Sequence, residues 1–169
     1  MGMILILHPI SDSEIESLTN NVSGISDFMS SEREDTIDLD KAWWGVHYLI
    51  SKNGNGDTEP YCYLLNRGTE LVSDPEDLND LFEEVGNIPR ALTSQQLKDF
   101  ERVVSEISDE ELKARFDPGD MMTHGVYPAI WDRDDPADLE YLCSYFQTLK
   151  EFLRELRKKD LGVLIDLSL

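Results

Sequence analysis

The sequence is poor in basic residues and contains no long apolar run. Its 169 residues carry 15 Lys and Arg against 35 Asp and Glu, which gives a formal net charge of −20. A sequence-independent nucleic-acid binder is disfavoured, because such proteins neutralise phosphates with many Lys and Arg side chains. No stretch approaches the roughly 20 consecutive apolar residues of a membrane-spanning helix. We therefore expect no nucleic-acid partner and no membrane insertion.

Cysteine is scarce, and the common catalytic motifs are missing. Cys62 and Cys143 form no C-x-x-C pair, so two reduced thiols are expected, although the sequence alone leaves a disulfide open. Glycine-rich phosphate loops and the G-x-S-x-G motif are absent. The apolar start lacks the basic region of a signal peptide. These features predict a soluble, cytoplasmic protein with no cofactor and no metal, and they leave open whether it is an enzyme.

The composition still supports a folded core. Hydrophobic residues make up 40% of the chain, and its length predicts a single domain over residues 1–169. Apolar runs at 3–7 and 163–167 predict terminal strands that pair with each other. Capping boxes begin at Ser11 and Thr93. The pattern predicts an α+β fold, mostly helical, with a small mixed or antiparallel sheet. Helices are expected at 12–24, 41–50, 75–85, 94–107, 109–116 and 136–159.

The remaining segments are harder to interpret. Residues 24–37 and 52–57 are polar and predict loops. Asp40 is placed to cap the helix that follows it, and Asp117-Pro118-Gly119 is expected to stop a helix. The short aromatic run at 61–65 fits either a strand or a buried helix.

Several residues fit either a structural or a functional role. His47 lies one helical turn from Trp43, so it is either a hydrogen-bonded core histidine or a general base in a pocket. Arg90 either forms a structural ion pair, with Asp40 or Asp117 as candidate partners, or clamps a carboxylate or phosphate. Tyr127 and Trp131 belong to an apolar segment interrupted by Pro128. That segment either covers the core or presents its rings to a ligand.

Residues 39–49, LDKAWWGVHYL, resemble the signature of the YfbM-like family, a bacterial group that carries a domain of unknown function. Stretches at 1–3, 89–93, 111–118 and 121–131 resemble the same family in order and spacing. One departure is that a single glycine, Gly68, stands where the family usually has a Gly-Gly element. The resemblance implies an α+β domain and implies no activity. Residues matching the motifs are the candidate site: Asp40, Lys41, Trp43, His47, Arg90, Tyr127 and Trp131.

Two functional hypotheses follow. The excess of acidic residues favours a protein-binding module of the immunity or inhibitor type that covers a basic protein partner. The alternative is an enzyme or small-ligand binder with a pocket around His47, Arg90 and Tyr127. Mimicry of DNA and simple solubility are further explanations of the charge, and the oligomeric state stays open.

Overall fold

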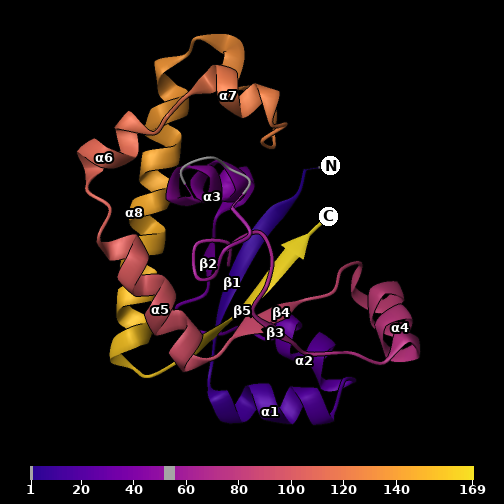
Figure 1. The fold of residues 1–169 in the computed structure, drawn as a ribbon. Coiled ribbons are helices and arrows are strands. Elements are labelled where there is room, and N and C mark those ends of the chain that lie inside the picture. The colour runs from indigo at the N-terminus through magenta and orange to yellow at the C-terminus, as the bar shows by residue number, and fades with distance from the viewer. Residues whose placement is uncertain (1, 52–55) are drawn as a thin grey trace.

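The computed structural model describes residues 2–51 and 56–169. Met1 and most of the loop expected at 52–57 lie outside these ranges. Within them, five strands form one antiparallel sheet in the order β2-β1-β5-β4-β3 (Figure 1). The strands are β1 (Ile4–Ile10), β2 (Ile37–Asp38), β3 (Thr69–Glu70), β4 (Arg90–Leu92) and β5 (Gly162–Ser168).

The two ends of the chain form the centre of this sheet. β1 pairs with β5 over seven residues, from Ile4 opposite Ser168 to Ile10 opposite Gly162. The predicted pairing of the terminal strands is thereby confirmed. The other three strands have two or three residues each and flank this central pair.

Local capping defines most of the helices. The capping boxes predicted at Ser11 and Thr93 are both formed, with Glu14 and Gln96 as the reciprocal partners. Asp74 and Asp135 cap helices that have Pro in the first turn. The helices are α1 (Asp12–Asn20), α2 (Gly24–Ser30), α3 (Trp43–Ser51), α4 (Pro75–Val85), α5 (Ser94–Ser105), α6 (Asp109–Ala114), α7 (Pro118–Thr123) and α8 (Pro136–Lys158), with 3-10 turns η1 (Asp40–Ala42) and η2 (Trp131–Arg133).

Three local predictions are wrong. The expected loop at 24–37 contains α2 and β2. Asp117 caps α7, with its carboxylate accepting a hydrogen bond from the Asp120 N–H, so the Asp-Pro-Gly element starts a helix. The run at 61–65 forms consecutive turns, because the Cys62 carbonyl accepts from the N–H groups of Leu65 and Asn66.

Alternation along the strands divides the core between the two faces of the sheet. Leu5 and Leu7 belong to the larger core, together with apolar residues of α3, α5 and α8. Ile10 and Leu164 belong to a smaller core with residues of α1, α2 and α4. One sheet therefore carries both helical layers, as expected for adjacent strand residues that point to opposite faces. None of the helices described is long and apolar enough to cross a membrane.

Both cysteines are free thiols. Cys62 is buried, whereas Cys143 on α8 is half-buried. The possibility of a disulfide, left open by the sequence, is thus settled in favour of two thiols.

Candidate functional site

Three of the candidate residues lie around residues 2–3, and two of them form an aromatic stack. The ring of Trp43 stacks on Tyr127, with centroids 6.2 Å apart. The Trp43 indole N–H donates to the Met3 carbonyl at 3.2 Å, and the Met3 N–H donates to the Tyr127 hydroxyl at 3.0 Å. A Cβ added at Gly2 would lie 2.3 Å from Cε of Lys41 and 2.9 Å from the Tyr127 hydroxyl. Lys41, Trp43 and Tyr127 therefore converge on residues 2–3, where Trp43 and Tyr127 bind the backbone of Met3 and Lys41 packs against Gly2.

Asp40 lies in η1, directly before Lys41. It does not cap α3 as predicted, because its φ of +46° places it in the left-handed region and Leu39 occupies the N-cap of η1. Its carboxylate instead accepts a hydrogen bond from the Tyr141 hydroxyl at 2.8 Å. This contact ties η1 to α8, so Asp40 acts in this structure as a tertiary link.

Trp131 and His47 are interior residues. Trp131 is 1% exposed, and its indole N–H donates to the Val126 carbonyl at 2.7 Å. Its ring packs against α3 at Gly45, where an added Cβ would lie 3.2 Å from the ring. His47 on α3 is completely buried. Both positions fit the structural reading of these residues.

Arg90 holds a turn of the backbone. One guanidinium nitrogen, Nη1, donates to the carbonyls of Tyr63, Asn66 and Arg67 at 2.6, 3.3 and 3.1 Å. Burial lowers the pKa of Arg90 to about 10. The expected ion pair with Asp40 or Asp117 is wrong, because backbone carbonyls take the place of a carboxylate.

The contacts of the candidate residues therefore form separate groups. Tyr127, Trp43, Lys41 and Asp40 lie around the N-terminal segment, whereas Arg90 clamps the turn at 63–67. Among the described residues, no group of three or more His, Cys, Asp or Glu side chains is placed to hold a metal ion.

One buried polar group was missed by sequence reasoning. On the face of the sheet opposite the larger core, His8 Nε2 lies 3.5 Å from Asp166 Oδ2. The Asn87 amide donates to the other oxygen of Asp166 at 2.7 Å. The three side chains are 4%, 7% and 9% exposed. A histidine beside a carboxylate can act as a general base. These side chains are buried on the side of the smaller core, so we interpret them as structural. The sequence signals were one histidine and one acidic residue, each within an apolar terminal strand.

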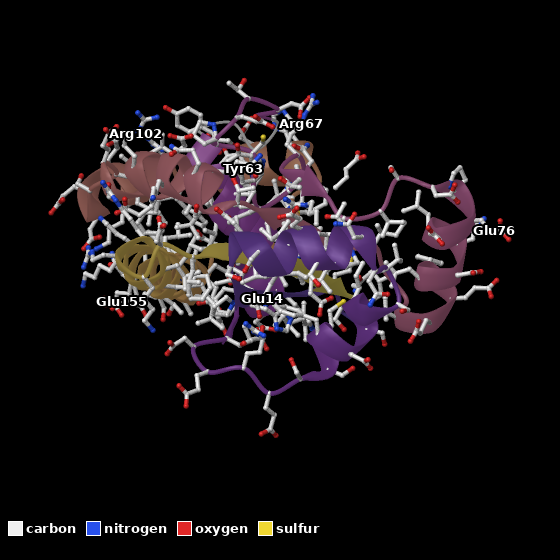
Figure 2. The ribbon with its side chains drawn as sticks, turned by 90° about the horizontal axis from the view of Figure 1, so that it is seen from below. Glu14, Tyr63, Arg67, Glu76, Arg102 and Glu155 are labelled. Atoms are coloured by element: carbon white, nitrogen blue, oxygen red, sulfur yellow. The ribbon has the colours of Figure 1, made fainter. Side chains whose placement is uncertain are left out.

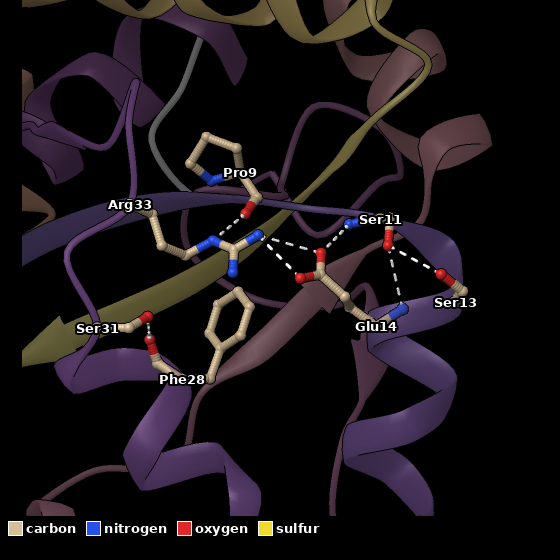
Figure 3. A network of polar contacts seen from close by, with 7 residues as sticks. All are labelled: Pro9, Ser11, Ser13, Glu14, Phe28, Ser31 and Arg33. Carbon is tan, nitrogen blue, oxygen red and sulfur yellow. Dashed lines mark hydrogen bonds and ion pairs between the residues drawn. The ribbon is translucent and has the colours of Figure 1, made fainter.

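A polar network centred on Arg33 links the helices on this side of the sheet (Figure 3). Arg33 Nη2 donates to both carboxylate oxygens of Glu14, and Arg33 Nε donates to the Pro9 carbonyl at 3.1 Å. The guanidinium carbon lies 4.3 Å from the centroid of the Phe28 ring, whose edge contacts His8. Although partial burial raises the pKa of Glu14, hydrogen bonds from Ser11 and Arg33 hold it below its ordinary value. Arg33 thus joins α1, α2 and β1.

The most distinctive surface is α4, which sequence reasoning treated only as a helix. Seven acidic residues and no Lys or Arg lie between Arg67 and Arg90. The helix is at the edge of the molecule, on the side opposite α8 (Figure 1), and Glu76 points outward from it (Figure 2). Leu81 is buried, whereas Phe82 and nearby Ile88 are 50% and 49% exposed. The surface, which we call the α4 face, combines negative charge with two exposed apolar side chains.

Alkaline pH is expected to destabilise the protein through Tyr48 and Tyr141. Burial, and then a hydrogen bond to Asp120, raises the pKa of Tyr48 above its ordinary 10. Burial, and then a hydrogen bond to Asp40, raises the pKa of Tyr141 in the same direction. Because the unfolded tyrosines lose their protons first, this stabilisation is complete below pH 10 and is lost as the pH rises above that value. Urea unfolding midpoints at about pH 8 and about pH 11 measure the loss.

The control is the double variant Tyr48→Phe/Tyr141→Phe. It lacks both hydroxyl protons, so its midpoint should fall less between the two pH values than that of the unchanged protein. An equal fall in both proteins would show that other groups govern the alkaline transition.

Comparison with known proteins places the chain in a family. Residues 1–165 match the family described as "Domain of unknown function (DUF1877)". The chain is also similar to a solved structure, that of YfbM from Escherichia coli, a protein of unknown function. The TM-score is 0.70 at 16% sequence identity, over 97% of this chain and 99% of that one, which shows a shared fold. No curated protein matches the chain. The resemblance predicted from residues 39–49 is confirmed, and the chain belongs to the DUF1877 family, the YfbM-like proteins of unknown function.

Proposed function

We propose that this protein is a protein-binding module of the immunity or inhibitor type, and that its α4 face docks on a basic protein partner. The observation that carries the proposal is the combination, on the α4 face, of negative charge with the exposed side chains of Phe82 and Ile88. Glu83 and Glu84 are exposed beside Phe82, and no Lys or Arg occurs from residue 68 to residue 89.

Physical chemistry favours such a surface for binding. A few buried side chains near the centre of an interface, many of them aromatic, supply most of the binding energy. Surrounding carboxylates increase the association rate with a positively charged partner and select against negatively charged ones. Phe82 fits the first role, and the acidic residues of α4 fit the second. A stable complex would bury roughly 1,200–2,000 Å² in total, so residues around α4 must contribute as well.

The experiment compares three proteins in affinity capture from a lysate of the cells of origin. The first is the unchanged protein, and the second is Glu83→Lys/Glu84→Lys. The third is a control, Glu106→Lys/Glu151→Lys, which changes two exposed acidic residues, one directly after α5 and one on α8. Each double reversal changes the net charge by the same amount, −20 + 4 = −16. We expect one stoichiometric basic partner with the unchanged protein and with the control, and its loss with the α4 variant.

Salt provides a second criterion. Raising the ionic strength from about 0.1 M to about 1 M shortens the Debye length from ~10 Å to ~3 Å, so the captured partner should be released. Equal capture by all three proteins would mean that overall charge, and not the α4 face, retains the partner. No capture at low salt would remove the main support for a binding module.

A further inference from the structure

A concave surface lies between α6, α7 and the first turns of α8. It has a volume of about 650 Å³, within the roughly 300–1,000 Å³ typical of small-molecule sites. Phe116 and Pro118 form one wall, and Leu139 and Cys143 of α8 form the other. Trp131 contributes to the floor. We call this surface the Trp131 groove.

The walls of the groove are apolar, and its floor is rigid. Trp131 is fixed because it is buried and its only polar hydrogen is donated to the Val126 carbonyl. Phe116, Leu139 and Cys143 are half-buried, so their inner surfaces are packed and their outer surfaces face the hollow. An apolar body of about the size of one aromatic ring would gain burial here without leaving a buried polar group unpaired.

The charged side chains at the rim make the groove negative overall. Among the described residues that line it are three carboxylates, Asp134, Asp135 and Glu140, and one ammonium, Lys113. Asp135 caps α8 by accepting from the Ala137 N–H at 2.9 Å. Asp134 and Glu140 are exposed. A ligand with a positive charge is therefore favoured over one with a negative charge.

Cys143 is not activated as a nucleophile in this setting. Burial raises the pKa of its thiol, and Asp109 and Glu140 act in the same direction, while Lys113 opposes them. A thiol with a raised pKa is largely protonated near neutral pH and reacts slowly. The groove is accordingly suited to reversible binding, and the thiol serves as a reporter of occupancy.

We propose that the Trp131 groove binds a small organic cation that carries an apolar body, in the chemical class of an arylalkylamine. The ring lies between α8 and the start of α7, and the ammonium group lies at the rim beside Asp134 and Glu140. This proposal does not rest on the proposed protein partner, because the groove and the α4 face share no residue.

The test uses 2-phenylethylamine as the probe, with 2-phenylethanol and 3-phenylpropionate as neutral and anionic counterparts. A ligand of this size is expected to bind with a dissociation constant on the order of 1 mM. Binding is measured by calorimetry and by the rate at which iodoacetamide alkylates Cys143, read from the mass of its peptide. At an amine concentration ten times the dissociation constant, alkylation should slow by about tenfold. Cys62 is fully buried and serves as an internal check that the protein stays folded.

Two variants locate the site. Ser144→Trp places a large side chain at an exposed position on the rim and should abolish binding. Thr148→Trp, one turn further along α8 and outside the groove, should leave binding unchanged. Neutralising the rim with Asp134→Asn/Glu140→Gln should weaken amine binding by about three- to tenfold.

Each other outcome overturns the proposal. Binding that survives Ser144→Trp would place the amine elsewhere on the acidic surface. Stronger binding of 3-phenylpropionate would mean that Lys113 sets the preference and that the charge assignment is wrong. No binding of the amine at several times the expected dissociation constant would show that the groove is only a surface hollow. Circular dichroism of each variant establishes that the fold is retained.

Discussion

Replacing Trp131 with alanine is expected to lower the free energy of unfolding by about 3–5 kcal/mol. The side chain is 1% exposed and packs against α3 at Gly45. Its removal leaves a cavity between α3 and α8 and leaves the Val126 carbonyl without its indole donor. Since domains have a stability of roughly 5–15 kcal/mol, this single change removes a large share of it. Chemical denaturation followed by circular dichroism measures the difference.

Trp131→Phe is the matched control. Phenylalanine keeps an aromatic ring in the groove floor and loses the indole N–H, so a smaller loss of about 1–2 kcal/mol is expected. A loss below about 1 kcal/mol for Trp131→Ala would contradict the view that this residue is central to packing. The prediction also bears on the groove, because the alanine variant removes part of its floor.

Gly162→Ala is expected to destabilise the protein by roughly 3 kcal/mol, although it adds a single methyl group. Gly162 begins β5, and a Cβ at this position would lie 2.1 Å from the Leu92 carbonyl oxygen and 3.1 Å from the Thr93 carbonyl carbon. Those atoms belong to the backbone where β4 passes into α5, so no side-chain rotation relieves the clash. The central strand and its neighbour must move apart. The unfolding midpoint in urea measures the effect.

Gly119→Ala provides the comparison. This exposed glycine lies in the first turn of α7, and an added Cβ would come no closer than 3.6 Å to another group, the Asp117 carboxylate. The substitution is expected to stabilise the protein by about 0.4–1 kcal/mol, because alanine restricts the unfolded chain. Similar midpoints for the two alanine variants would refute the role given to the close approach at Gly162.

Sequence reasoning succeeded where the determining contacts are local. The Ser11 and Thr93 capping boxes need only residues three positions apart, and both form. The long helix predicted at 136–159 is observed over Pro136–Lys158 because its proline, its cap and its apolar stripe agree. The strand β4, at three residues, is too short to show a period, so its place beside β5 was not predicted.

The candidate site could be predicted only in part. The family signature pointed to Trp43, Lys41 and Tyr127, which converge on residues 2–3. Spacing could not show that Arg90 binds carbonyls of the turn at 63–67. Every residue has a backbone carbonyl, so the sequence does not indicate which of them accept hydrogen bonds from a side chain. For the same reason the buried contact of His8 with Asp166 was missed, since it depends on the register of two strands from opposite ends of the chain.

The sequence by itself determined the α+β class, the family, the main helix caps and the excess of negative charge, because these depend on composition and on neighbours along the chain. Only the tertiary structure decided which side chains meet. It brought Trp43 and Tyr127, which are more than 80 residues apart in the sequence, together at residues 2–3. It also exposed Phe82 on α4 and formed the Trp131 groove between α6, α7 and α8. Such features arise from the packing of distant elements, and sequence spacing carries no measure of the distance between them.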